Sequence, residues 1–212
     1  MSLRLSEIFF SIQGEGPLVG FPTFFVRLYG CNLNCSWCDT PYAREGDRYK
    51  VVTPEEILKI WKKSYVEIPY VTITGGEPLL QRESLKLIHL FLERKVKVLL
   101  ETNGSLEIKE VPKEVLIVMD VKTPSSGMSH YNYFENFKYL KEEDALKFVI
   151  KDKGDFDWSL EIISKFDLLK RCTCFFSPAS PYFSPKELAQ LILEIRKPLR
   201  LQIQLHKILN LK

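Results

Sequence analysis

The chain has 212 residues, of which 45% are hydrophobic and 27% charged, a composition typical of soluble globular proteins. Its 30 basic and 27 acidic residues give a formal net charge of +3, which is too balanced to indicate a nucleic-acid-binding protein. No apolar run reaches the roughly 18 residues needed to span a bilayer, and residues 1–10 lack the pattern of a signal peptide. We therefore expect a single cytoplasmic domain over residues 1–212, without nucleic-acid or membrane partners.

Short apolar, β-branched segments recur along the chain and are separated by amphipathic stretches, which indicates β-strands alternating with α-helices. We expect strands at residues 23–29, 70–74, 96–101, 115–120, 146–150, 171–176 and 199–205. Such strands are parallel and joined by right-handed crossovers. About six βα units fit, fewer than the eight of a closed barrel. The expected fold class is α/β, with a partial (β/α)6-like barrel or open sheet that is mostly parallel.

Two of the expected helices carry clear start signals. Thr53 precedes Pro54 and lies three residues before Glu56, as in a capping box, and Ser184 precedes Pro185. The apolar residues expected to face the core from four helices are Ile57, Leu58 and Trp61; Leu85, Ile88 and Leu92; Leu160, Ile163 and Phe166; and Leu188, Leu191, Ile192 and Ile195. In an α/β fold of this kind, the ligand lies at the carboxyl ends of the strands.

Three of the five cysteines fall within eight positions, directly after the strand expected at 23–29. Cytosolic thiols stay reduced, so such a group indicates metal binding or redox chemistry and not disulfides. Cys31, Cys35 and Cys38 are separated by three and then two residues, which lets one loop wrap three thiolates around a [4Fe–4S] cluster. Such a cluster ordinarily takes four cysteines. With no fourth cysteine nearby, one iron would keep an open position for a non-protein ligand.

Other interpretations of the cysteines stay open at this point. The loop could instead hold zinc with a fourth ligand from His89, His130 or His206, all of which are distant in sequence. Cys172 and Cys174 lie in an apolar run, where a free cysteine packs as a small hydrophobic residue. We expect these two in the core, with a second metal site as the alternative.

The cysteine spacing, with Trp37 directly before the last cysteine, resembles the signature of the radical S-adenosylmethionine superfamily. Thr74-Gly75-Gly76-Glu77-Pro78 resembles a second superfamily feature, in which glycines let the backbone approach a ligand closely. The resemblance implies a radical SAM core in which S-adenosylmethionine chelates the open iron through its amino and carboxylate groups. Electron transfer would then cleave the cofactor to a 5′-deoxyadenosyl radical that abstracts hydrogen.

Further segments resemble the 7-carboxy-7-deazaguanine synthase family. They are residues 6–16, 25–33, 39–40, 122–127 and 204–207, the last of which is similar to the family's C-terminal strand. The resemblance implies a carbon–nitrogen lyase that contracts 6-carboxy-5,6,7,8-tetrahydropterin to 7-carboxy-7-deazaguanine with release of ammonia, on the route to queuosine. It also implies a homodimer that uses Mg²⁺ and S-adenosylmethionine and takes electrons from a flavodoxin-like or ferredoxin-like donor.

The same resemblance assigns the substrate contacts. It places them at Ile12, Gln13, Gly14, Arg27 and Thr74. The amide of Gln13 can match the donors and acceptors of a pterin edge, and Arg27 can clamp a carboxylate with two parallel hydrogen bonds. Because Arg27 lies in an apolar strand, its charge needs a partner, which favours this role over that of a surface charge.

Two more residues could contact the substrate. Glu15 either binds the pterin or caps the turn between Gly14 and Gly16, and both interpretations stay open. Lys212 matches the family's last residue, which reaches the substrate, and its terminal carboxylate would be the contacting group.

The cofactor and metal contacts are also implied by the resemblance. Cys31, Cys35 and Cys38 would hold the cluster, and Thr40, which also precedes Pro41 in a turn, would ligate Mg²⁺ through its hydroxyl. S-adenosylmethionine would be bound by Trp37, Cys38, Asp39, Gly76, Asp120, Val121, Lys122, Ser177, Pro178, Ala179 and Ser180. The family usually has Ser-Pro-Lys where this chain has Asp120-Val121-Lys122, and Gln-Pro where it has Ser177-Pro178. Contacts that the cofactor makes with the backbone would be kept despite these differences.

Two other functions compete with this interpretation. The first is a glycyl-radical-enzyme activase, a small radical enzyme acting on a protein partner, which nothing in residues 13–16 supports. The second is a non-enzymatic iron–sulfur electron carrier or zinc-binding module. A carrier would ordinarily have four cysteine ligands, and the motif at residues 74–78 would have no role in it.

Overall fold

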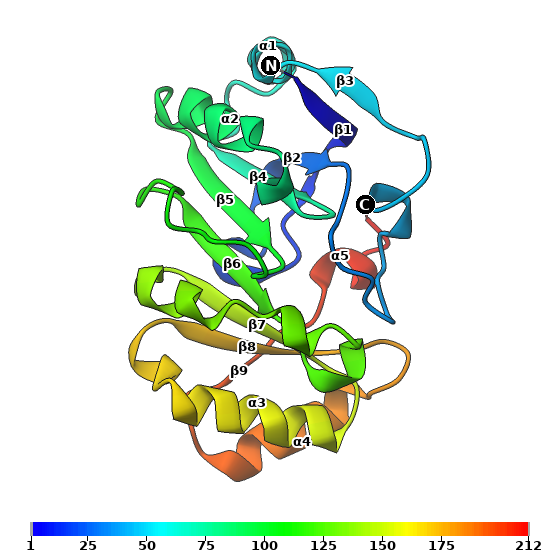
Figure 1. The fold of residues 1–212 in the computed structure, drawn as a ribbon, viewed down its shortest axis with the longest axis vertical. Coiled ribbons are helices and arrows are strands. Elements are labelled where there is room, and N and C mark those ends of the chain that lie inside the picture. The colour runs from blue at the N-terminus through cyan, green and yellow to red at the C-terminus, as the bar shows by residue number, and fades with distance from the viewer. Residues whose placement is uncertain (1, 212) are drawn as a thin grey trace.

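The structure is a computed structural model that describes residues 2–211. Its strands are β1 (Leu3–Ile12), β2 (Pro22–Leu28), β3 (Lys50–Val52), β4 (Tyr70–Gly75), β5 (Lys97–Thr102), β6 (Leu116–Val121), β7 (Ala145–Ile150), β8 (Thr173–Pro178) and β9 (Arg200–Leu201). Within the described residues they form one sheet in the order β3-β1-β2-β4-β5-β6-β7-β8-β9 (Figure 1). β1 is antiparallel to β2 and β3, whereas all neighbours from β2 to β9 are parallel. The expected α/β fold with a mostly parallel sheet is thus confirmed.

The α-helices are α1 (Pro54–Ser64), α2 (Glu83–Leu92), α3 (Lys153–Lys165), α4 (Pro185–Ile195) and α5 (Leu205–Ile208). Short 3₁₀ helices lie at Gly16–Leu18, Pro41–Ala43, Pro78–Leu80, Pro124–Ser126, Ser129–Tyr131, Phe134–Tyr139 and Leu168–Lys170. Both predicted start signals are confirmed, because the side chains of Thr53 and Ser184 accept hydrogen bonds from the first turns of α1 and α4. None of the helices in residues 2–211 combines the length and apolarity needed to cross a membrane.

Two crossovers between parallel strands contain no α-helix, and none of the four predicted helices lies in them. Segment 103–115, between β5 and β6, contains no α-helix, and segment 122–144, between β6 and β7, contains only 3₁₀ helices. Prolines and glycines interrupt both segments, and these residues disfavour a continuous helix. The buried side chain of Asn136 ties the two segments together by binding the backbone of Leu106 and Ile108.

The two ends of the sheet also differ from the expectation. β1 and β3 were not expected, although residues 3–6 alternate apolar and polar side chains as a half-buried strand does. The strand expected at 199–205 ends at Leu201, and α5 follows it. The expectation that residues 204–207 belong to a strand is therefore wrong, because Leu205–Ile208 form α5 and the Leu205 N–H binds the Gly14 carbonyl.

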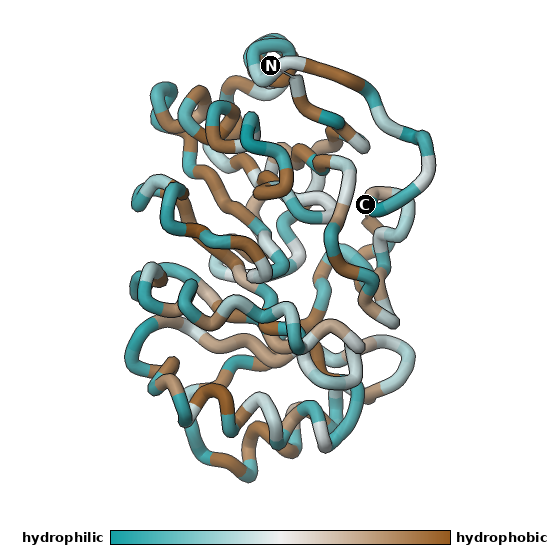
Figure 2. Tube along the Cα trace, viewed as in Figure 1, coloured by the Kyte–Doolittle hydropathy of each residue, from teal (hydrophilic) through white to brown (hydrophobic). Residues whose placement is uncertain are grey.

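Side chains alternate between two faces along β5 to β8, as they must in extended strands. One face packs against α1 to α4 and forms the main core, with Val98 and Leu100 as its β5 members. The opposite face holds a smaller apolar cluster of Leu18, Leu99, Val118, Ala145 and Phe175. Figure 2 shows the strands as mainly hydrophobic and the outer turns of the helices as mainly hydrophilic. The smaller cluster closes the interior of the partial barrel below the site described next.

The capping box of α1 gives a stability prediction. The Thr53 Oγ1 atom accepts from the Glu56 N–H at 3.2 Å, and the Glu56 carboxylate accepts from the Thr53 N–H at 2.7 Å. Replacing Thr53 by alanine should lower the free energy of unfolding by about 1 kcal/mol, measured by urea denaturation, because an amide at the helix start loses its partner. Thr53→Ser retains the acceptor and should stay within about 0.5 kcal/mol of the natural protein. Equal losses in both variants would contradict this account of the cap.

Candidate active site

A polar layer lies directly above the smaller apolar cluster, on the same face of the sheet. It consists of Glu101 on β5, Asp120 on β6, Lys147 on β7 and Ser177 on β8, each two residues beyond a member of that cluster. Two residues is the repeat that returns a side chain to the same face of a strand. The alternation therefore places three ionisable groups and one hydroxyl on the same face, near the carboxyl ends of β5, β6 and β8 and at the middle of β7.

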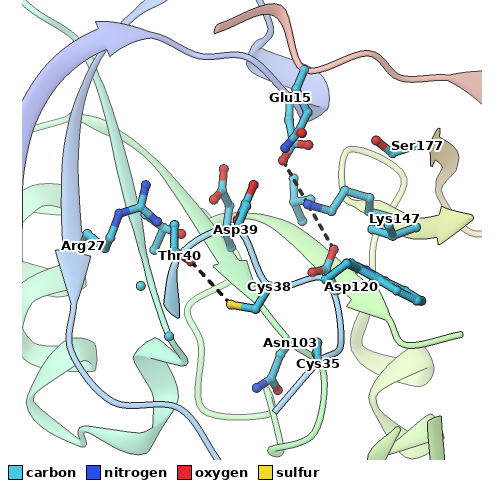
Figure 3. Close-up of a pocket in the computed structure, with 18 of the residues that line it drawn as sticks. Glu15, Arg27, Cys35, Cys38, Asp39, Thr40, Asn103, Asp120, Lys147 and Ser177 are labelled. Carbon is cyan, nitrogen blue, oxygen red and sulfur yellow. Dashed lines mark hydrogen bonds and ion pairs between the residues drawn. The ribbon is translucent and has the colours of Figure 1, made fainter. Parts of the chain in front are cut away.

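This layer lines a pocket of about 370 Å³ (Figure 3). The pocket brings together most of the predicted site residues: Ile12, Gln13, Glu15, Arg27, Cys31, Cys35, Trp37, Cys38, Asp39, Thr40, Thr74, Gly76, Asp120, Lys122, Ser177, Pro178 and Ser180. Their contacts with ligands stay predictions. The convergence of these distant segments on one pocket is what a shared site requires.

Three predicted residues do not line the pocket, and Lys212 lies outside the described residues. The side chains of Val121 and Ala179 are buried, that of Val121 in the main core, so these residues can offer a ligand only their backbone. Gly14 instead supports the C-terminal segment, because a Cβ there would lie 2.0 Å from the Nδ1 atom of His206. A larger residue at that position would displace the His206 side chain.

Fifteen further residues line the pocket that the sequence interpretation did not assign to the site. Among them are Glu101, Asn103, Lys147, Gln204, His206 and Lys207. Glu101 and Lys147 were detectable, because each is an ionisable residue in an apolar strand, the signal that singled out Arg27. Asn103 and the C-terminal residues carry no comparable local signal.

Lys147 bridges carboxylates from two parts of the pocket (Figure 3). Its Nζ atom lies 2.9 Å from Glu15 Oε2 and 3.2 Å from Asp120 Oδ1, and Asp120 Oδ2 lies 2.7 Å from Lys122 Nζ. Burial alone would lower the pKa of Lys147, but the charges of Asp120, Glu15 and Glu101 hold it well above its usual value. Burial would likewise raise the pKa of Asp120, and Lys122 and Lys147 hold it below the usual value. The bridge is therefore ionised on both sides.

The side chain of Glu15 points to this bridge and makes no hydrogen bond to the adjacent 3₁₀ helix. The turn-capping interpretation of Glu15 is thus wrong for its side chain. The neighbouring Gln13 donates from Nε2 to Thr72 Oγ1 at 3.0 Å and to Glu101 Oε1 at 3.2 Å. Burial, and then the charge of Glu15, raise the pKa of Glu101. Gln13 and Glu101 together form a fixed polar wall of amide and carboxyl groups.

Arg27 faces the pocket from β2, and the Nε edge of its guanidinium group is bound by another side chain. Its Nε atom donates to Glu7 Oε1 at 3.0 Å, and the Tyr42 hydroxyl donates to the same oxygen at 2.8 Å. The ring of Phe9 lies 5.5 Å below the guanidinium carbon. Because Glu7 takes the Nε edge, the terminal nitrogens can serve an anionic ligand in the pocket.

The cysteine loop reaches the pocket beside two positions, Gly30 and Gly76, at which only glycine fits. Gly30 has a φ of +99°, and a Cβ on Gly76 would lie 2.3 Å from the Gly30 carbonyl oxygen and 2.8 Å from Cys31 Cβ. All five cysteines are free, and Cys31, Cys35 and Cys38 are partly exposed and line the pocket, whereas Cys172 and Cys174 are buried. This confirms the core interpretation of the last two.

The three thiols suit a metal cluster chemically. Burial raises the pKa of the Cys31 and Cys35 thiols, so their thiolates need a positively charged partner to persist there. Among residues 2–211, no three His, Cys, Asp or Glu side chains are grouped to hold a metal ion. A cubane does not need that grouping, since each thiolate binds a different iron. Thr40 lies beside this loop, with its hydroxyl 4.0 Å from Cys38 Sγ, and also starts the 3₁₀ helix that follows.

Glu77, in the motif after β4, is a structural residue. Its buried carboxylate accepts from Leu79 N at 2.9 Å, from Thr102 Oγ1 at 2.9 Å and from Asn103 N at 2.6 Å. Burial raises its pKa although these donors oppose the shift. The contacts tie the turn after β4 to the end of β5, where the cluster loop rests.

The C-terminal segment closes one side of the pocket (Figure 1). The Leu205 N–H donates to the Gly14 carbonyl at 3.2 Å, and Gln202 Oε1 accepts from Gly16 N at 2.7 Å. Lys207 Nζ lies 2.8 Å from Asp39 Oδ2, next to the cysteine loop. The start and end of the chain therefore build one wall together.

The Lys147 bridge predicts a pH-dependent loss of stability. Lys147→Met removes the cation that the buried Glu15 shares with the partly exposed Asp120, although Asp120 keeps Lys122 as a partner. The free energy of unfolding at pH 7.5 should therefore fall by about 3 kcal/mol in urea denaturation. The folded-state pKa of Asp120 is lowered by Lys147, so its stabilising contribution exists above the unfolded-state pKa and disappears as pH falls. The difference between the two proteins should therefore narrow as the pH falls below about 4, the usual carboxyl pKa.

A matched control is Lys153→Met, which breaks the exposed pair with Asp157 on α3. That variant should lose less than about 1 kcal/mol at either pH. A loss for Lys147→Met that is equally small, or that is independent of pH, would contradict the proposed bridge.

Comparison with known proteins places the chain in a family. The model of the Radical SAM superfamily matches residues 25–195. The chain is 39% identical to the 7-carboxy-7-deazaguanine synthase of Chlorobaculum tepidum, over 97% of this chain and 93% of that protein. It is 38% identical to the synthase of Clostridium acetobutylicum, over 99% of this chain and 96% of that protein.

Solved structures share the fold. The crystal structure of QueE from Escherichia coli superimposes with a TM-score of 0.81 at 23% identity, covering 97% of this chain and 95% of that one. Streptococcus suis SuiB bound to S-adenosylmethionine gives a TM-score of 0.59 at 14% identity, covering 86% of this chain and 46% of that one. From these matches and the site geometry, the chain belongs to the radical S-adenosylmethionine superfamily and, within it, to the 7-carboxy-7-deazaguanine synthase family.

Proposed function

We propose that this protein converts 6-carboxy-5,6,7,8-tetrahydropterin to 7-carboxy-7-deazaguanine with release of ammonia, a ring contraction in queuosine biosynthesis. The observation that carries the proposal is a single pocket in which the three-cysteine loop faces the Gln13–Glu101 wall and Arg27. The names of the curated relatives agree with this activity. The alternative of a glycyl-radical-enzyme activase is not favoured, because those relatives match over the full chain.

The cysteine loop gives this site its cofactors. Cys31, Cys35 and Cys38 would hold a [4Fe–4S] cluster, and the open iron position would bind S-adenosylmethionine. When bound, the cluster and S-adenosylmethionine supply the one-electron chemistry that removes a hydrogen atom from the substrate. The tight contact between Gly30 and Gly76 keeps the loop against the turn after β4, so the thiols stay at the pocket wall.

The S-adenosylmethionine side of the pocket would be built from β4, β6 and β8. The proposed contacts are Trp37, Cys38, Asp39, Gly76, Asp120, Val121, Lys122, Ser177, Pro178, Ala179 and Ser180. Asp120 is ionised beside Lys122 and Lys147, so it can accept hydrogen bonds from hydroxyl groups. Val121 and Ala179 would contribute backbone groups, since their side chains are buried.

The substrate side would be built from β1, β2, β4 and β5. Arg27 would clamp the substrate carboxylate, with Glu7 and Tyr42 fixing its orientation. Ile12, Gln13, Glu15 and Thr74 would border the pterin ring, and Gly14 would act by making room for His206 beside it. Glu101, whose pKa is raised by burial, could donate a proton in a hydrogen bond. The Thr40 hydroxyl would contribute one ligand to Mg²⁺, which usually keeps several waters or substrate oxygens.

The partners of the proposed enzyme follow from its chemistry. The reaction starts with an electron, so a small reductant of flavodoxin or ferredoxin type must reach the cluster. We also propose a homodimer, as the family resemblance implies, and a cytoplasmic location, which the five free cysteines support.

The turnover assay tests the proposed activity. Anaerobically reconstituted protein with dithionite, S-adenosylmethionine, Mg²⁺ and carboxytetrahydropterin should form a product with the mass and absorbance of 7-carboxy-7-deazaguanine. Arg27→Gln should raise KM for the pterin at least tenfold, since hydrogen bonds to a charged group contribute about 1.5–3 kcal/mol. The exposed Arg48→Gln serves as a matched control and should leave KM unchanged. A reconstituted cluster without deazaguanine product would contradict the proposal.

The C-terminus gives a second prediction about the substrate. His206 and Lys207 line the pocket, and the terminal carboxylate of Lys212, five residues beyond Lys207 in the sequence, is a proposed pterin contact. Extending the chain with a six-histidine tag at the C-terminus should raise KM for the pterin. The same tag at the N-terminus is the control, because β1 runs from Leu3 to Ile12 and only its later residues, Phe9 and Ile12, line the pocket. Equal KM values for the two tagged proteins would contradict a role for the chain end.

A further inference from the structure

The side chain of Asn103, at the end of β5, meets the cysteine loop at one of its thiols. Its Nδ2 atom lies 3.6 Å from Cys31 Sγ and 3.1 Å from Asn32 Oδ1. The first distance suits a hydrogen bond to sulfur, which has a larger radius than oxygen. Asn103 is only 6% exposed, so water does not compete freely for these contacts.

The orientation of this amide is fixed by Ser105. Asn103 Oδ1 accepts from the Ser105 backbone N–H at 3.0 Å and from Ser105 Oγ at 2.6 Å. A backbone N–H can only donate, so the oxygen of the amide must face Ser105 and the nitrogen must face Cys31. Asn32 Nδ2 donates to Ser105 Oγ at 2.8 Å and closes a ring of side chains around the thiol.

The backbone of Asn103 is anchored independently of its side chain. The buried Glu77 accepts from the Asn103 N–H at 2.6 Å and from the Thr102 hydroxyl. Since Glu77 is wholly buried, this anchor holds the end of β5 rigidly against the turn after β4. The amide of Asn103 is therefore presented to Cys31 in one position.

Cys31 is distinguished from the other two cysteines of the loop by its donors. Its sulfur also lies 3.4 Å from the backbone N of Leu33, which gives it two N–H donors. Within residues 2–211, neither Cys35 nor Cys38 has an N–H donor to its sulfur. The hydrogen bonding of the three thiols is asymmetric, and Asn103 supplies the only side-chain N–H among these described contacts.

We propose that Asn103 is a positioning residue that donates an N–H···S hydrogen bond to the Cys31 thiolate of the bound cluster and raises its reduction potential. Hydrogen bonds to cluster sulfurs are one of the protein's means of setting that potential. Reduction adds negative charge to the cluster, and a donor that points at a ligating sulfur stabilises the more negative state. The inference rests on the proposed function, because it requires a cluster on Cys31, Cys35 and Cys38.

The test is a redox titration of the reconstituted holoenzyme without S-adenosylmethionine, followed by EPR of the reduced cluster. Asn103→Leu keeps the size of the side chain and removes the donor, so the midpoint potential should shift to a more negative value. Ser105→Ala is a milder variant that keeps the donor but removes one of the two groups that orient it. Ser105→Ala should shift the midpoint potential in the same direction as Asn103→Leu, but by a smaller amount. If Asn103→Leu does not hold the cluster, Ser105→Ala still tests the hydrogen bond.

The matched control is Asn136→Leu. Asn136 is also buried and binds the backbone of Gly104, Leu106 and Ile108, so it holds the same loop without touching a cysteine. This variant should keep the natural midpoint potential. An unchanged potential in the Asn103 and Ser105 variants, or an equal shift in Asn136→Leu, would overturn the inference while leaving the proposed function intact. Natural protein that holds no cluster after reconstitution would overturn both.

Discussion

The alternation of side chains along four parallel strands is the constraint on which this molecule depends. From β5 to β8 one position in two belongs to the helix-packed core, and the others line the interior of the partial barrel. At the middle of the strands these interior positions are apolar and fill the space. Two residues later they are polar and line the pocket. A shift of one residue in any of these strands would exchange core and site side chains, so the register fixes stability and the site together.

The charged layer is stable because its members compensate each other. Burial removes Lys147 and its neighbouring carboxylates from water, which destabilises each charge alone. The attraction between the lysine and the carboxylates of Glu15 and Asp120 offsets this desolvation cost. The carboxylates come from different parts of the fold, Glu15 from the turn after β1 and Asp120 from β6. A single ammonium group thus joins the proposed substrate side to the proposed S-adenosylmethionine side. The arrangement links the two binding regions through direct contacts.

A second network supports the cysteine loop and is almost entirely uncharged. Gly76 allows the turn after β4 to touch the loop, and Glu77 ties that turn to the end of β5. Asn103 then reaches the Cys31 thiol from this anchored position. The cysteines themselves lie on a loop without regular secondary structure, so their positions depend on these neighbours. The motif at residues 74–78 therefore acts on the cluster site from the outside, through backbone contacts.

The sequence by itself determined the α/β class, seven of the strands, the two helix start signals and the three-cysteine loop. Each of these depends on local pattern, namely apolar runs, capping residues and ligand spacing, which are legible without knowledge of distant contacts. It also marked Arg27 as a charge in need of a partner, and the same reasoning applies to Glu101 and Lys147. Only the tertiary structure decided that Glu15 meets Lys147, that Gly14 makes room for His206, and that Asn103 faces Cys31. The two residues of each of these contacts lie between 72 and 192 positions apart in the sequence. They meet because the sheet brings the ends of its strands to one edge, and no local sequence pattern encodes which side chains meet there.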